Sequence, residues 1–213
     1  MISMEMANFP FLTVLLLTNL VALLVIMFIP PERDKLIKQV SLFFAGITIV
    51  ISLYLYITYD TGKGGLQFVE RYLWVKSLGI YYFVGADGIN LPMLLLTSVV
   101  LFTGVLTMWE LENRVKEFFA FMYLLVIGVY GVFMSFDLFF IFVWYDVALF
   151  PMYPLIVIWG STRKEYGGMK LTLYLLAGSA LILPAILYLW AKSGLNTFDL
   201  IALHNAGFTT HVQ

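Results

Sequence analysis

The sequence contains no cysteine in its 213 residues and has only two histidines, both near the C-terminus. The absence of thiols excludes disulfides, thiolate-ligated zinc and cysteine-bound iron–sulfur clusters within this chain. Two histidines, both near the C-terminus, are too few for a haem pair inside a helical bundle. We therefore expect no cofactor and no metal in the chain.

Charge is also scarce. Charged residues make up 12% of the sequence, whereas soluble domains carry roughly 25%. The net charge of −1 gives no electrostatic attraction for nucleic acid. Hydrophobic residues make up 62% of the chain, which is more than a soluble fold of this size could keep from water. The composition therefore predicts an all-α membrane protein in contact with the lipid bilayer.

Six apolar runs are long enough to cross a bilayer, for which a helix needs roughly 20 residues. They cover residues 9–29, 40–59, 91–109, 118–134, 137–159 and 171–190, and we expect them to form one transmembrane domain over residues 1–213. The first run ends at Pro30 and Pro31 and follows no basic segment, so it is interpreted as a retained helix and not a signal peptide. Residues 60–90 mix charged, aromatic and β-branched side chains, which predicts an extramembrane loop with a small surface hairpin.

The basic residues predict an orientation. Eight of the 12 lysines and arginines lie in the links after the first, third and fifth runs, and four lie on the opposite side. Because cytoplasmic loops carry the excess of positive charge, we expect the N-terminus to lie outside.

Asp146 is the one charged residue placed near the middle of an apolar run. It lies about 14 Å from the start of the fifth predicted helix at 1.5 Å per residue. An ionised carboxylate at that depth is expensive, so it is usually paired, hydrated or protonated. One interpretation is a group that loads and unloads a proton, and the other is a neutral acid that holds two helices together by a hydrogen bond.

Other candidates lie on the same helix or on the next. Pro151 and Pro154 cannot donate hydrogen bonds within the fifth helix, so they loosen it beside Asp146 or form a packing kink. Asp137 at the start of that helix is either a dipole-stabilising cap or an acid at the outer mouth of a proton path. Lys170 at the start of the sixth helix is a candidate for proton translocation, or a snorkelling anchor at the cytoplasmic surface.

Several motifs resemble one family. Residues 85–92 read GADGINLP and are followed by LLLT at 94–97; residues 137–140 read DLFF, 149–153 LFPMY, 158–160 IWG and 170–174 KLTLY. In this order they resemble chain 4 (subunit M) of the proton-pumping NADH–quinone oxidoreductase, respiratory complex I. The wider superfamily is that of the antiporter-like subunits.

The resemblance implies a fold and a role. The family's fifth helix carries a glutamate five residues before the proline of its Pro-Met-Tyr motif, and in this sequence that position is Asp146, preceded by Tyr145. The resemblance implies a non-redox, proton-translocating subunit of an enzyme complex in a bacterial inner membrane. Its expected partners are neighbouring antiporter-like subunits.

The family fold has about fourteen helices arranged as inverted repeats. The six runs here correspond to the N-terminal part, ahead of the seventh helix with its lysine partner for the acid. The ending at residues 207–213 resembles an interruption.

Two alternatives stay open. The chain could be a subunit of a multisubunit sodium/proton antiporter or of a membrane hydrogenase, or it could be a structural spacer in a membrane complex. The residues leave the electron donor, the quinone and the choice of proton or sodium undetermined.

Overall fold

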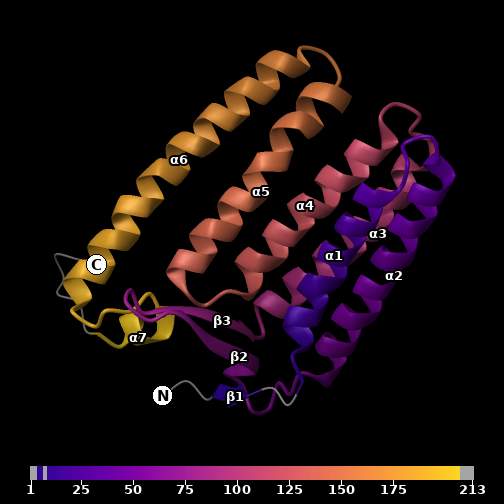
Figure 1. Ribbon diagram of the computed structural model, residues 1–213. Helices are drawn as coiled ribbons and strands as arrows, with labels where there is room; N and C mark the ends of the chain where they lie inside the picture. The colour runs from indigo at the N-terminus through magenta and orange to yellow at the C-terminus, as the bar shows by residue number, and fades with distance from the viewer. Residues whose placement is uncertain (1–3, 7–8, 207–213) are drawn as a thin grey trace.

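The computed structural model describes residues 4–6 and 9–206. The terminal segment 207–213, in which the sequence suggests an interruption, lies outside the described residues. Within them, six helices are long and apolar enough to cross a membrane, as the sequence predicted. Figure 1 shows these six helices side by side. They are α1 (Phe11–Phe28), α2 (Asp34–Thr58), α3 (Asn90–Thr107), α4 (Val115–Met134), α5 (Leu138–Trp159) and α6 (Lys164–Ser193).

Two helices begin six and seven residues earlier than the apolar runs indicate. The second begins at Asp34 where the sequence suggested residue 40, and the sixth begins at Lys164 where it suggested residue 171. Apolar character reports only the part of a helix that lies in hydrocarbon, while backbone hydrogen bonding continues into the charged turns beyond it. Lys170 therefore lies within α6 and not at its start.

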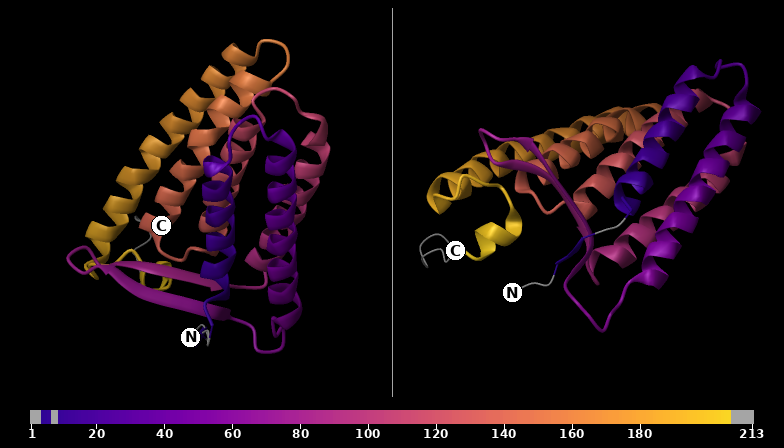
Figure 2. Two further views of the ribbon diagram at one scale, coloured as in Figure 1. Left: turned by 45° about the vertical axis from the view of Figure 1, so that its right-hand side comes forward. Right: turned by 60° about the horizontal axis from the view of Figure 1, so that its bottom comes forward.

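A small sheet lies across one end of the bundle, as both views in Figure 2 show. Strands β2 (Leu66–Val75) and β3 (Ile80–Ala86) pair antiparallel within the loop for which a hairpin was expected. The sequence did not indicate strand β1 (Met4–Met6), which pairs parallel with β2. It also did not indicate the short helix α7 (Leu200–His204) that follows α6. A 3-10 turn, η1 (Met108–Glu110), extends α3.

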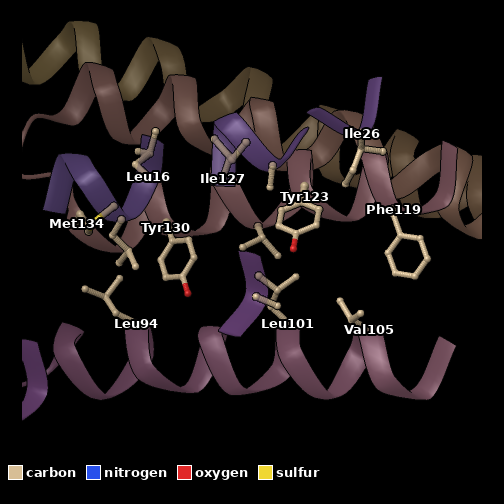
Figure 3. Close-up of a cluster of buried hydrophobic side chains, with 14 of the residues drawn as sticks. Leu16, Ile26, Leu94, Leu101, Val105, Phe119, Tyr123, Ile127, Tyr130 and Met134 are labelled. Atoms are coloured by element: carbon tan, nitrogen blue, oxygen red, sulfur yellow. The ribbon is translucent and has the colours of Figure 1, made fainter. Parts of the chain in front are cut away.

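The core of the bundle is formed by α1 to α4, and α4 is its centre because it contacts α1, α2, α3 and α5. Figure 3 shows large side chains of α4, among them Phe119, Tyr123 and Tyr130, between α1 and α3. Helix α6 packs on α5 and lies at one edge of the bundle (Figure 1). The pair α5–α6 is thus joined to the core mainly through α4.

Buried hydroxyl groups join three helices of this core. Ser98 on α3 lies 2.5 Å from the hydroxyl of Ser52 on α2 and 2.6 Å from the hydroxyl of Tyr130 on α4. All three side chains are buried. Polar groups inside a bilayer need partners within the protein, so this cluster satisfies its own hydrogen bonds and fixes the three helices against one another.

A buried carboxylate fixes the hairpin to α1. Glu70 on β2 accepts hydrogen bonds from the backbone N–H groups of Leu12 (3.0 Å) and Thr13 (3.3 Å), and from the Thr13 hydroxyl. These are first-turn groups of a helix, which lack partners within the helix and attract negative charge. Burial nevertheless raises the pKa of the Glu70 carboxyl above its ordinary value. The hairpin therefore supplies the N-terminal cap of the first span.

Candidate functional site

Close contact between α4 and α5 positions the middle of α5. A Cβ atom added at Gly128 would lie 2.5 Å from the backbone nitrogen of Ala148, and one added at Gly131 would overlap the indole ring of Trp144. Small residues of this kind let membrane helices approach closely. Trp144 and Ala148, the residues of α5 that face these two glycines, lie two positions before and two positions after Asp146. The close contact therefore fixes the turn of α5 that carries this acid.

Asp146 faces α6. The hydroxyl of Ser179 donates a hydrogen bond of 2.6 Å to Oδ1 of Asp146. Ser179 is 4% exposed, and Asp146 is half-buried. Asp146 lies eight residues after the first residue of α5, about 12 Å along the helix. Within the part of the chain that the structure describes, Ser179 is the hydrogen-bond partner of this carboxylate, and Oδ2 makes no hydrogen bond.

The two prolines do not break α5, which runs without interruption from Leu138 to Trp159. Pro151 is buried and Pro154 is half-buried. Because a proline has no N–H to donate to the residue four positions earlier, the carbonyls of Val147 and Phe150 lose their usual helical donor. Carbonyl oxygens without that donor therefore lie on α5 directly after Asp146.

Asp137 has the geometry of a helix cap. Its carboxylate accepts hydrogen bonds from the backbone N–H groups of Phe139 (3.0 Å), Phe140 (3.3 Å) and, from β3, Tyr81 (3.0 Å). The side chain is fully buried, and burial raises the pKa of the Asp137 carboxyl. Nine residues of helix separate it from Asp146, which is two and a half turns. The structure therefore does not bring the two acids together.

Lys170 is exposed on α6. Its ammonium lies 3.5 Å from the Tyr166 hydroxyl and over the rings of Tyr166 (5.5 Å) and Tyr174 (5.8 Å). Nine residues also separate Lys170 from Ser179, so the lysine lies on the opposite face of α6 from the serine that contacts Asp146. The structure thus leaves this lysine apart from the carboxylate.

Ser179 is the residue of this site that the sequence did not indicate. Asp146 lies 13 residues before the end of α5, and Ser179 lies 15 residues after the start of α6. In two antiparallel helices joined by a short link, such positions lie at similar depth. A serine in an apolar run at the depth of the acid was therefore the available signal.

No group of three or more histidine, cysteine, aspartate or glutamate side chains suited to a metal ion occurs among the described residues. The carboxylates described above are used in hydrogen bonds to backbone or hydroxyl groups. The site offers hydrogen-bond and proton chemistry from side chains.

Part of the chain matches a known protein family. Residues 135–212 match the family described as "NADH:quinone oxidoreductase/Mrp antiporter, TM". The matched segment contains α5, α6 and both members of the Asp146–Ser179 pair. The resemblance to the antiporter-like membrane subunits is thereby confirmed.

The curated relatives that match this chain are chain 4 proteins of NAD(P)H-quinone oxidoreductase. The chain 4 protein of Nostoc sp. is 34% identical over 202 residues, which is 94% of this chain and 37% of the relative. That of Synechococcus sp. is 35% identical over 97% of this chain and 38% of the relative. The chloroplast protein of Chlorokybus atmophyticus is 34% identical over 93% and 39%. This chain therefore resembles chain 4, and it spans less than half the length of these relatives.

Solved structures support the fold. A chain of respiratory complex I from Thermus thermophilus superimposes with a TM-score of 0.82 and 23% identity, over 94% of this chain and 40% of that one. A chain of the archaeal membrane-bound sulfane sulfur reductase gives 0.71 and 19%, over 88% and 29%. Both matched chains belong to respiratory complexes.

Proposed function

We propose that this chain is a proton-translocating, non-redox membrane subunit of an NADH– or ferredoxin–quinone oxidoreductase. The observation that carries the proposal is the Asp146–Ser179 pair in the middle of two spans that match the antiporter-like family. The redox chemistry is assigned to other subunits.

Asp146 is suited to carry a proton because of its position. A carboxylate at mid-span is expensive to keep ionised and is usually functional. Ser179 occupies Oδ1 and leaves Oδ2 open within the described residues. The carbonyls released by Pro151 and Pro154 provide acceptors for water along the same helix.

The other two candidates receive supporting roles. Asp137 fixes the outer end of α5 through its three backbone hydrogen bonds. Lys170 lies beside the rings of Tyr166 and Tyr174 in the N-terminal part of α6. A long cationic side chain at this position reaches the membrane surface. We also propose that the N-terminus and the hairpin lie outside a bacterial inner membrane, because the links with most basic residues lie at the other end of the bundle. Neighbouring antiporter-like subunits are the proposed partners.

The test is a pair of substitutions at one position in the complete complex. Asp146→Asn removes the titratable group and keeps the size, whereas Asp146→Glu keeps the group. In inside-out vesicles given the electron donor and a quinone, we expect Asn to abolish the acidification that depends on this subunit and Glu to retain a part of it. Glu112→Gln, at an exposed carboxylate outside the spans, is the control. Acidification by the Asn variant equal to that of the control would contradict the proposal.

A second candidate function is supported by the description of the matched family, which includes Mrp antiporters. In that case sodium gradients would drive proton movement in vesicles without any electron donor, and Asp146→Asn would abolish it. A structural spacer is the third possibility. It predicts that Asp146→Ala assembles and pumps normally.

A further inference from the structure

We infer that Ser179 is a positioning residue for the proton-carrying carboxylate, holding Asp146 in one orientation from the neighbouring helix. The inference rests on the proposed function of Asp146. It adds a specific residue on α6 to a site that otherwise lies on α5.

The position of Ser179 on α6 supports this role. The buried residues of α6 are Gly168, Ser179 and Ile186, which are spaced by about three and two helical turns and so share one face. A Cβ added at Gly168 would lie 2.6 Å from a methyl group of Val157 on α5, whereas one at Gly178 would meet nothing within 4 Å. Ser179 therefore lies on the face of α6 that packs against α5, whereas the preceding residue, Gly178, lies outside this face.

Several serine and threonine hydroxyl groups in the spans bond to their own helix, whereas Ser179 bonds to a carboxylate on the neighbouring helix. Thr172 on the same helix donates to the carbonyl of Gly168 (2.8 Å), Thr48 donates to Phe44 (2.8 Å), and several others likewise bond four residues back. This is the ordinary way for a hydroxyl to be satisfied in a membrane helix. Ser179 instead donates across the interface to Asp146 at 2.6 Å.

Two physical consequences follow. A hydroxyl donor at 2.6 Å from a carboxylate oxygen is in the range of short, charge-assisted hydrogen bonds, so Ser179 restricts rotation of the Asp146 side chain. Alanine also has a higher helix propensity than serine. Replacement of Ser179 by alanine should therefore leave α6 folded and free the carboxylate to rotate.

The test uses infrared difference spectroscopy on the complete complex in native membranes. Asp146→Asn identifies the carboxyl band of Asp146 by removing it. Ser179→Ala should move that band to higher wavenumber, because a carbonyl that loses a hydrogen-bond donor vibrates faster, and should lower proton pumping about tenfold. Ser179→Thr, which keeps a hydroxyl, should restore both.

Matched variants separate the possible outcomes. Ser98→Ala removes an equally buried hydroxyl from α3 and should leave the band in place. If Ser179→Ala fails to assemble, Ser179→Cys, a weaker donor of similar size, should give a smaller shift in the same direction. A band removed by Asp146→Asn but unmoved by Ser179→Ala and Ser179→Cys would overturn this inference and leave the proposed function standing. Normal pumping by Asp146→Asn would overturn the proposed function itself.

Discussion

Adding one methyl group at Gly131 should separate α4 from α5. The added Cβ would overlap the ring of Trp144, and a rigid indole cannot move aside as a flexible side chain can. Overpacking of this kind costs about 1–3 kcal/mol, while alanine gains up to about 1 kcal/mol over glycine in a helix. Gly131→Ala should therefore lose about 1–2 kcal/mol of unfolding free energy.

Gly46→Ala is the matched control, because a Cβ at this position on α2 meets nothing within 4 Å. It should be neutral or stabilising by up to about 1 kcal/mol. Thermal unfolding of the purified protein in detergent, followed by circular dichroism, compares the two variants. At about 2–4 °C per kcal/mol for a chain of this size, Gly131→Ala should melt roughly 2–8 °C below wild type. Equal melting temperatures for the two variants would refute the close helix contact.

Two further substitutions test other contacts. Burial raises the pKa of Glu70, so the folded protein binds this proton more tightly than the unfolded chain does. The resulting stabilisation of the folded state is full below the unfolded-state pKa. It is lost as pH rises through the higher folded-state pKa. Glu70→Gln should therefore remove a decline in melting temperature that wild type shows as pH rises above about 4.5, and an unchanged pH profile would contradict this. Tyr130→Phe removes the hydroxyl 2.6 Å from Ser98 and should cost about 1 kcal/mol in the same melting assay, whereas Tyr54→Phe, at an exposed tyrosine, should cost almost nothing. Equal effects of the two tyrosine variants would argue against the buried cluster.

The spans could be predicted from the sequence because bilayer thickness imposes a minimum length on an apolar run. The start of α6 could not be predicted in this way. Arg163 adopts a left-handed conformation (φ 54°), and the ammonium of Lys164 donates to the carbonyl of Ile158 at 2.8 Å. These are contacts within a polar turn, to which hydropathy is insensitive.

The short elements have a different origin. Strand β1 has three residues and α7 has five, too few for intrinsic propensity to decide their structure. Each depends on a tertiary contact: β1 pairs with β2, and the cap of α7, Asp199, forms an ion pair with Arg71 on β2 at 2.8 Å. Such partners are far apart in sequence.

The candidate site was predicted in part. Asp146 could be identified because a lone carboxylate in an apolar run is costly, whatever the fold. Ser179 was not singled out: its depth matches that of the acid, but a serine in a span usually bonds to its own helix, as Ser98 does to the carbonyl of Leu94. Only the packing of α6 on α5 shows that its hydroxyl donates to the acid.

The number of protons moved per electron shows whether Asp146 carries protons, because this ratio separates translocation from electron flow. It should be measured in vesicles containing the complete complex, with wild type, Asp146→Asn and Glu112→Gln compared at matched rates of quinone reduction. We expect a lower ratio for Asp146→Asn and the wild-type ratio for Glu112→Gln. A wild-type ratio for Asp146→Asn would contradict the claim that protons pass through this carboxylate.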